Sequence, residues 1–580
     1  MKRIFVISAL VGLGLLSGCG GNGKSGGGET KEGKGGVVYG GVFKMNEVED
    51  FKSLYPLDIT EVGSHRIGNQ VYEGIVKLNQ EDLSVEPCLA EKWDVNEDAT
   101  QFTFYLRKGI KFHDDPCFPE GKGREVKAQD IKYCLDKICE SHPQNQMFWL
   151  FKDKVKGAVD YYEASKSGTL PANGVEGIKI IDDYTIQIDL TYPFAGFLNI
   201  LSHSAGWIYP KEAYDKYGIE LSRHAVGTGA FRVKAVKQGE AVVLEKNPDY
   251  WGIDQYGNKL PYLDGIKVTF IKEKKTELME FRKGNLDMIF RLPLEMIEDV
   301  VGELDEAKKG GNKPFVMQVV PAMSLFYYGF QNKTAPFDNK KLRQALNYAI
   351  DRDAIVTYTL QGEGEAAIHG VVPPFKGYPY ETVKGFEFNP ELARQLLSEA
   401  GFPGGKGLGK ITLHINSGGG DRNVHTAEVI QKMLKENINV DVDIEILQWA
   451  QHLDNYETGK SVFWRTGWIA DYPDPENFLN LFYGKHVPAE MSDRSFINSV
   501  RFQNAKFDSI FEVALRIVDT KERYELFAQA DQIIVDEAAC MPIFYDENTR
   551  LIQVKVKNFP ANAMEYRDLS EVYFKEEEQK

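Results

Sequence analysis

Short runs of β-branched and aromatic residues dominate the first half of the chain. Residues 102–106 (FTFYL) form one bulky run, and residues 178–190 (IKIIDDYTIQIDL) form two runs around a central Asp-Asp pair. These patterns predict a strand and a β-hairpin, and residues 242–244 (VVL) predict a further strand. Helices are expected near residues 128–139 and 276–283. We therefore expect a β-rich first half.

Helical periodicity becomes common after about residue 320. Asp338 can cap a helix whose apolar positions recur at helical spacing: Leu342, Ala345, Leu346, Ala349 and Ile350. A second helix is expected after Asn389-Pro390 and before Gly401. An Asx cap, a proline at the first helical position and a glycine just past the end agree with one another.

A strand–helix–strand unit follows these helices. Apolar and polar residues alternate in 411–415 (ITLHI) and again in 440–446, which predicts two strands. The pattern of residues 426–436, between them, predicts a helix. Such a unit implies a parallel or mixed sheet covered by helices. The sequence therefore predicts two α/β lobes of different character, without an internal repeat.

The N-terminus has the pattern of an export signal. Lys2 and Arg3 precede a short apolar stretch, residues 4–16, which ends in Leu-Ser-Gly and then Cys19. A stretch this short is typical of a secretory signal and not of a spanning helix. Cys19 in this setting resembles the lipidated cysteine of bacterial lipoproteins; the alternative is an ordinary signal peptide with a chance cysteine.

Residues 20–36 are rich in glycine and polar residues, so we expect a flexible linker. Residues 18–25 (GCGGNGKS) match the pattern of a phosphate-binding loop. That pattern needs a buried strand before it and a helix after it, and here it lies in the linker. We reject the phosphate-binding interpretation.

Composition excludes several function classes. The formal net charge is −16, which argues against nucleic acid as a partner. No later segment is apolar for long enough to span a bilayer. Five cysteines follow Cys19, an odd count, and we expect buried thiols: Cys88, Cys117, Cys134, Cys139 and Cys540. No spacing of Cys or His predicts a metal site, and no cofactor is expected.

An enzymatic function is not indicated. There is no G-x-S-x-G motif and no glycine-rich turn between a strand and a helix. The pairs Asp114-Asp115 and Asp471/Asp474 could act as acid and base, but neighbouring carboxylates are usually solvated loop residues. We expect a binding protein.

The best candidate site is the aromatic stretch 463–475 (FWRTGWIADYPDP). A strand there ends in a proline-rich turn, so its last side chains project from the strand end. Ligands of α/β lobes gather outside the carboxyl ends of strands. Trp468 offers a flat apolar wall and Asp471 a negative charge, which suits the amine of a peptide. The alternative is that Trp468 belongs to the core and Asp471 caps the next helix, as Asp474 also could.

An ordered set of motifs resembles the family 5 extracellular solute-binding proteins, the peptide- and nickel-binding group that serves ABC importers. The matching stretches run in the family's order over nearly the whole mature chain: residues 71–75, 89–93, 102–114 with 128–131, 226–231, 247–251, 337–338, 343–346, 349–351, 468–478, 507–508 and 541–544. The chain departs from many relatives between His113 and Ala128, where an insert contains Cys117. We expect a surface loop there, in which a disulfide to another cysteine is one alternative.

The resemblance implies an α/β, two-lobed periplasmic-binding-protein-like fold of the class II (cluster C) type, with mixed β-sheets and two hinge-crossing strands. The ligand is enclosed when the lobes close. The implied division is a signal peptide (1–18), a lipidated cysteine and linker (19–36), lobe 1 (37–320 plus 546–580, with an additional subdomain at about 64–205) and lobe 2 (321–545), with crossings near 319–331 and 540–550.

The resemblance also implies site residues. Asp471 matches an aspartate that pairs with a peptide's α-amine, Trp468 lines the pocket, and Arg465 matches an arginine that meets a ligand carboxylate in some members. Glu61, Val62 and Gly63 match main chain that lies along a peptide like an added strand; the alternative for Glu61 is a solvated loop charge.

The implied protein is a monomeric, lipid-anchored component on the extracytoplasmic (periplasmic) side that delivers peptides to an ABC permease. Other solutes, namely nickel chelates, haem or oligosaccharides, and a signalling or adhesion role remain alternatives because fold alone does not name the ligand.

Overall fold

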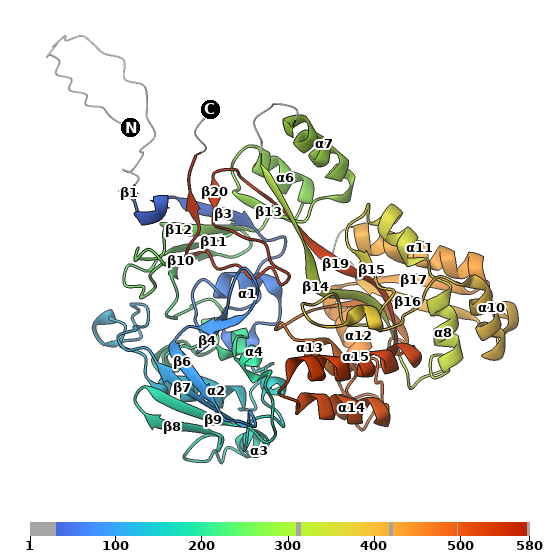
Figure 1. The fold of residues 1–580 in the computed structure, drawn as a ribbon, viewed down its shortest axis with the longest axis horizontal. Helices are drawn as coiled ribbons and strands as arrows, with labels where there is room; N and C mark the ends of the chain where they lie inside the picture. The colour runs from blue at the N-terminus through green and yellow to red at the C-terminus, as the bar shows by residue number, and fades with distance from the viewer. Residues whose placement is uncertain (1–30, 309–314, 417–420, 496, 577–580) are drawn as a thin grey trace, which may run out of the picture.

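The computed structural model describes residues 31–308, 315–416, 421–495 and 497–576. It has an α/β fold with two lobes joined by two long strands (Figure 1). We define the first lobe by the elements from β2 to α7 together with β20 and β21, and the second lobe by the elements from α8 to α15. The joining strands are β14 (Val316–Phe330) and β19 (Cys540–Ile552).

The first lobe contains two four-stranded sheets. One has the order β10-β11-β12-β3, in which β12 and β3 are parallel, and the other has the order β6-β7-β9-β8 and is antiparallel throughout. Their strands are β3 (Val42–Asn46), β6 (Ala90–Val95), β7 (Gln101–Leu106), β8 (Ile178–Asp182), β9 (Thr185–Asp189), β10 (Phe231–Lys237), β11 (Ala241–Lys246) and β12 (Gly265–Thr269). The predicted strands in this half and the predicted hairpin are confirmed.

Helices cover these sheets and link them. The predicted helices near 128–139 and 276–283 are confirmed as α2 (Ala128–Ile138) and α6 (Lys274–Arg282). The other helices of the first lobe are α1 (Val62–Gly68), α3 (Ala158–Lys166), α4 (Phe197–Leu201), α5 (Lys211–Tyr217) and α7 (Ile297–Lys308). Small antiparallel pairs are formed by β4 (Val76–Leu78) with β5 (Val85–Pro87) and by β20 (Val556–Lys557) with β21 (Tyr573–Phe574).

One seven-stranded sheet runs through the second lobe. Its order is β13-β19-β14-β18-β16-β17, and β15 pairs with β19. Its remaining strands are β13 (Met288–Phe290), β15 (Glu365–Ala366), β16 (Lys410–Asn416), β17 (Asp441–Leu447) and β18 (Phe463–Ile469). Strand β16 is parallel to both β17 and β18, which confirms the predicted strand–helix–strand unit.

The helices of the second lobe lie around this sheet (Figure 1). They are α8 (Lys340–Tyr348), α9 (Arg352–Ala354), α10 (Pro390–Glu399), α11 (Asp421–Ile438), α12 (Trp449–Glu457), α13 (Glu476–Leu479), α14 (Ala505–Leu515) and α15 (Thr520–Asp536). Asn389 caps α10 through the Leu392 amide, as predicted. The predicted cap of α8 is wrong, because Asn339 and not Asp338 accepts the amides of Lys341 and Leu342.

The two predicted crossing strands are confirmed, and their pairing is irregular at two points, of which the one nearer Pro321 is the larger. Strands β14 and β19 pair antiparallel from Val316 with Ile552 to Gly329 with Cys540. The register shifts between the pairs Pro321/Glu547 and Leu325/Tyr545, so three residues of β14 lie opposite one residue of β19, Asp546. Such a bulge bends a strand pair, and it lies where the chain passes from one lobe to the other.

The expected linker ends earlier than predicted. Strand β1 (Lys31–Glu32) pairs with β2 (Val38–Tyr39), and the backbone of Lys34 exchanges hydrogen bonds of 2.9 Å with the side chain of Asn258. Residues 31–36 are therefore fixed to the first lobe. Cys19 and the export signal lie outside the described residues. Among the helices that the structure describes, none has the length and apolar character needed to cross a membrane.

Candidate functional site

The candidate site is built on the carboxyl end of β18. Since β17, β16 and β18 are parallel neighbours, their carboxyl ends meet at one edge of the sheet, where ligands of α/β folds bind. Beyond β18, Pro473 and Pro475 prevent further strand pairing. The chain then enters α13, which begins at Glu476.

A buried asparagine holds the two central residues of the site. Asn477, in α13, is 2% exposed. Its Oδ1 accepts hydrogen bonds from Trp468 Nε1 at 2.7 Å and from the Asp471 backbone amide at 3.1 Å. Trp468 and Asp471 are thereby brought together, and the positions of both depend on one side-chain amide.

Within the described chain the carboxylate of Asp471 forms no ion pair, although the residue is half-buried. Burial raises the pKa of Asp471 to about 7, the Asn477 amide lowers it by a smaller amount, and the Glu476 carboxylate raises it. A carboxylate that loses hydration without gaining a partner favours a cationic ligand.

The alternative role for Asp471, a cap of the next helix, is not what the structure shows. Asp474 is the residue whose Oδ1 accepts the Glu476 amide, at 2.9 Å. Asp474 is also fully buried and paired with Arg523 at 2.7 Å, so its charge is neutralised within the protein. Trp468 is half-buried and packs against the core, so the core alternative applies to it in part.

Arg465 lies on the same strand but on the other face. It is three residues from Trp468, and side chains of a strand alternate. Its guanidinium lies 4.3 Å from the centre of the Phe326 ring and donates from Nη1 to Asn416 Oδ1 at 3.0 Å. Burial lowers the pKa of Arg465 to about 10, and Arg422 and Arg291 lower it further against the opposing effect of Tyr328.

Sequence reasoning missed residues that the fold adds to this edge of the sheet. Trp449 begins α12 just after the carboxyl end of β17 and is 50% exposed. The signal was present as a tryptophan three residues beyond the end of the predicted strand 440–446. Arg291 and Arg422 are far apart in sequence, yet the fold pairs both with Asp546 and brings both close enough to act on the charge of Arg465.

The main chain at Val62 and Gly63 is helical and not extended as the resemblance implied, and of these three residues only Glu61 has extended backbone angles. Glu61 is the N-cap of α1 and accepts the Ser64 amide at 2.9 Å and the Lys52 amide at 3.0 Å. Val62 and Gly63 form the first helical turn, whose backbone cannot pair as a strand does. Val62 is 38% exposed, so this turn presents a surface without the geometry of strand addition.

The insert between His113 and Ala128 is held by ion pairs and not by a disulfide. The five described cysteines are free, and Cys117 is half-buried. Burial and a hydrogen bond to Asp115 raise the pKa of the Cys117 thiol to about 12. Arg124 clamps the loop by pairing with Asp130 at 2.7 Å and with Glu212 at 2.6 Å.

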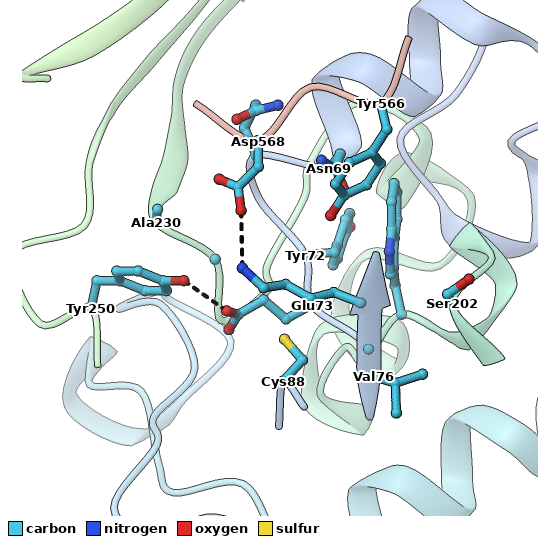
Figure 2. Close-up of a pocket in the computed structure, with 15 residues that line it drawn as sticks. Asn69, Tyr72, Glu73, Val76, Cys88, Ser202, Ala230, Tyr250, Tyr566 and Asp568 are labelled. Atoms are coloured by element: carbon cyan, nitrogen blue, oxygen red, sulfur yellow. Dashed lines mark hydrogen bonds and ion pairs between the residues drawn. The ribbon is translucent and has the colours of Figure 1, made fainter. Parts of the chain in front are cut away.

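A polar cavity of about 30 Å³ lies inside the first lobe (Figure 2), and neither Trp468 nor Asp471 lines it. The hydroxyl of Tyr250 donates to Glu73 at 3.0 Å, and Lys77 pairs with Asp568 at 3.1 Å. Such a volume holds a few water molecules at most and no larger solute. In the part of the chain that the structure describes, no three His, Cys, Asp or Glu side chains are arranged to hold a metal ion.

The chain is similar to known solute-binding proteins over most of its length. Residues 84–488 match the family model described as bacterial extracellular solute-binding proteins, family 5 middle. The periplasmic oligopeptide-binding protein OppA of Salmonella typhimurium is 28% identical over 516 residues, 88% of each chain. The heme-binding protein A of Haemophilus influenzae is also 28% identical, covering 86% of this chain and 85% of that one.

A solved structure shows the same fold. The periplasmic binding protein DppA of Helicobacter pylori, in complex with the peptide STSA, superposes with a TM-score of 0.78 at 26% identity, covering 93% of this chain and 99% of that one. The α/β, two-lobed binding-protein fold is therefore confirmed. The chain belongs to the family 5 bacterial extracellular solute-binding proteins, which are substrate-binding components of transport and not enzymes.

Proposed function

We propose that this chain is the lipid-anchored, extracytoplasmic solute-binding component of an ABC importer and that its solute is a peptide. The observation that carries the peptide assignment is the half-buried carboxylate of Asp471, which has no cationic partner among the described residues and lies beside Trp468. A peptide supplies both complements, an ammonium group for the carboxylate and an apolar side chain for the indole. Relatives named for oligopeptide binding and a neighbour bound to a peptide support the same assignment.

In this proposal the ligand binds between the lobes and stabilises their closed arrangement. Lobe 1 comprises residues 37–320 and 546–580, with a subdomain at about 64–205, and lobe 2 comprises residues 321–545. Asp471, Trp468 and Arg465 contact the ligand from lobe 2, while Glu61, Val62 and Gly63 face it from lobe 1. A closed monomer is then the form that the permease recognises, because the ligand favours the state in which it touches both lobes.

Native mass spectrometry of the soluble part of the chain, from residue 31 onwards, tests the ligand class. We expect co-purified peptides in the unchanged protein and none in Asp471→Asn. A peptide that binds when it is added to the unchanged protein should no longer bind after its N-terminus is acetylated. Asp443→Asn is the matched control, because Asp443 is exposed on β17 and pairs with Lys410. A non-peptide adduct, such as haem or a metal chelate, or peptides that survive Asp471→Asn, would move the assignment to another solute.

The anchor is tested separately. Cys19 lies outside the described residues, so its lipidation is proposed from the sequence pattern alone. Cys19→Ser should release the protein from the membrane fraction and abolish incorporation of labelled palmitate. Retention on the membrane with no label would indicate a different mode of attachment.

A further inference from the structure

Three segments that are distant in sequence form one surface at an end of the first lobe, where β1 and β20 lie (Figure 1). The side chain of Asn258 accepts a hydrogen bond from the Lys34 amide and donates one to the Lys34 carbonyl, both at 2.9 Å. Lys575 joins them by donating to the Gly36 carbonyl at 3.2 Å. We call this surface the tether surface, and it consists of residues 31–36, 253–259 and 575–576.

The loop 253–259 is held in a fixed shape by one buried aspartate. Asp254 accepts hydrogen bonds from the backbone amides of Tyr256 and Asn258 at 2.9 and 2.7 Å. It also accepts the side-chain amide of Asn258 at 2.6 Å and the hydroxyl of Tyr262. The charge of Asp254 is therefore used inside the loop, and the other side chains of the loop have a defined place at the surface.

Two large side chains of this loop are exposed. Ile253 is 68% exposed and Tyr256 is 49% exposed. The Tyr256 ring lies against the N-terminal segment, since a Cβ on Gly35 would be 2.7 Å from it. Ile253 and Lys259 pair as an isolated antiparallel bridge, so their side chains project on the same face. An apolar side chain, an amphipathic ring and a lysine stem next to one another suit the boundary between water and lipid.

Lysines outnumber acids among the exposed charges of the tether surface. The exposed lysines are Lys31, Lys34, Lys259 and Lys575, and the exposed acids are Glu32 and Glu576. Among the described residues none of these four lysines forms an ion pair, whereas Lys246 of β11 pairs with Asp264 at 2.8 Å. The whole chain has a formal net charge of −16, so the tether surface has the opposite sign to the rest. Unpaired lysines favour an anionic partner.

The position of Cys19 brings a bilayer within reach of the tether surface. Lys31 follows Cys19 by twelve positions in the sequence. A glycine-rich chain of this length spans about 20 Å on average and at most about 43 Å when fully extended. A short tether gives an effective concentration in the millimolar range, so even a weak contact with lipid headgroups is populated.

We propose that the tether surface docks on the anionic headgroups of the membrane that holds Cys19. Ile253 and Tyr256 then lie at the level of the headgroups, and the exposed lysines meet lipid phosphates. The inference rests on the proposed function for the lipid anchor and does not depend on the peptide assignment. The lobes can still close in this arrangement, because no residue of the tether surface belongs to the second lobe.

Hydrogen–deuterium exchange on vesicles tests the docking. The chain from Cys19 onwards is attached through the Cys19 thiol to a maleimide lipid, in vesicles of phosphatidylcholine or of equal parts phosphatidylcholine and phosphatidylglycerol. Maleimide selects Cys19, because four of the described cysteines are buried and the pKa of Cys117 is raised to about 12. We expect the amides of residues 253–259 to exchange at least about fivefold more slowly on the anionic vesicles, the factor that one lysine near such a surface supplies. Equal exchange on both kinds of vesicle would overturn the inference.

Variants separate docking from an effect of net charge. The double substitution Lys34→Gln with Lys259→Gln should remove most of the slowing on anionic vesicles, and Tyr256→Ser should reduce it. The matched control is Lys341→Gln with Lys432→Gln, which removes two exposed lysines of the second lobe and should leave the slowing unchanged. Unchanged exchange in β11 shows that a variant is folded. An equal loss of slowing in the control would mean that only the total charge acts, which contradicts the proposal.

The failure of this inference can be told from the failure of the proposed function. The tether is supplied chemically and no peptide is added, so neither absent lipidation in the cell nor a different solute affects the result. The vesicles contain no other protein, so slower exchange there reports contact with lipid. Slower exchange that arises only after membrane proteins are added to the vesicles would assign the tether surface to a protein partner and overturn the inference.

Discussion

Asp471 and Asp474 are three residues apart in sequence, yet their surroundings give them different chemistry. Asp474 is fully buried, pairs with Arg523 and caps the turn into α13. Asp471 loses hydration and gains only the neutral amide of Asn477. Because Arg523 neutralises Asp474 and no described cation neutralises Asp471, we propose Asp471 as the carboxylate that meets the ligand.

The raised pKa of Asp471 predicts how ligand affinity depends on pH. With a pKa of about 7 in the free protein, Asp471 is mostly neutral at pH 6 and mostly ionised at pH 8. An ammonium ligand binds the ionised form, and the peptide's α-amine is itself about half deprotonated by pH 8, so we expect affinity to rise by about fivefold from pH 6 to a maximum between pH 7 and 8. Affinity should fall again above about pH 8 as the peptide's α-amine loses its proton.

Calorimetry across this pH range with one peptide checks the prediction, and Asp471→Asn is the control. The variant should bind weakly and lose the rise below pH 8. Asp471 also makes the free energy of unfolding depend on pH, with the opposite sign, because its pKa is higher in the folded protein than the value of about 4 in the unfolded chain. Between pH of about 4 and about 7 the ligand-free protein therefore loses stability as pH rises, whereas Asp471→Asn should not. A pH-independent affinity in the unchanged protein would contradict this account.

At the scale of elements, local patterns predicted most of the fold. The strands and helices with clear periodicity, including the parallel pair β16 and β17, lie where the sequence places them. The misses have local causes. Asn339 competes with Asp338 one position away as a cap of α8, and Glu61 starts a short helix where an extended segment was expected.

The candidate site was only partly predictable for a different reason. Trp468 and Asp471 stand close in sequence, so their chemistry could be seen together. Arg291, Arg422 and Asp546 belong to three distant segments that meet only through the pairing of β13 with β19 and the start of α11. No local pattern encodes such a contact, because each arginine alone looks like a surface charge.

The packing of β14 against β18 predicts a specific sensitivity at Gly329. A Cβ at this position would lie 2.4 Å from the ring of Trp464, which is fully buried and stacked on Tyr456. Gly329→Ala should therefore destabilise the protein by about 1–3 kcal/mol through overpacking. Urea unfolding followed by tryptophan fluorescence measures the change.

Gly302→Ala is the control for this substitution. Gly302 lies in α7 with no atom near the added methyl group, so alanine should be neutral or stabilise by up to about 1 kcal/mol. Equal stability of Gly329→Ala and the unchanged protein would show that Trp464 can shift at little cost.

A buried ion cluster connects α1, β19 and the C-terminal segment. Glu565 pairs with Arg567 at 2.8 Å and lies 3.5 Å from Arg550, while Glu47 joins Arg66 and Arg567 at 2.8 and 2.9 Å. Three buried arginines here share two carboxylates. Removing either negative charge leaves arginines without compensation in the interior, where that is most costly.

We expect Glu565→Gln to destabilise the protein by about 3–5 kcal/mol at neutral pH. Burial would raise the pKa of Glu565, but Arg567, Arg550 and Arg66 bring it below the usual value. The ionised Glu565 thus contributes fully to stability above its pKa of about 4.3 in the unfolded chain. That contribution is lost as the pH falls through its lower pKa in the folded protein. The difference between the two proteins should narrow in acid.

Urea unfolding at pH 7 and pH 4 checks this second stability prediction. Glu240→Gln, which removes an exposed charge paired with Lys237, should change stability by less than about 0.5 kcal/mol. A neutral effect of Glu565→Gln would mean that the cluster repacks around the amide.

At the scale of the whole molecule, the lobes touch at a second place besides the crossing strands. Residues 192–199 of the first lobe, which lead into α4 (Figure 1), meet residues 474 and 516 of the second lobe, which lie just before α13 and just after α14. Asn199 donates to Asp474 at 3.5 Å, and the guanidinium of Arg516 lies 5.7 Å from the ring centre of Tyr192. A hinge that bends at the bulge opposite Asp546 would separate this contact, so the contact contributes to the balance between open and closed forms.

Tyr192→Ala should shift that balance toward the open form. Tyr192 is half-buried and faces Arg516 across the lobes, and it also packs against Phe194 in its own lobe, so we expect its loss to weaken the closed state more than the open one. Without ligand, we expect this variant to have a larger radius of gyration by small-angle X-ray scattering than the unchanged protein. Its apparent affinity for the ligand should fall in proportion to the decrease in the fraction of closed molecules. Tyr162→Ala is the matched control, because Tyr162 stacks on Phe148 inside the first lobe, with ring centres 4.0 Å apart. That variant should lose stability without changing the radius; an equal radius in both variants would mean that the lobes are held only by the crossing strands and the ligand.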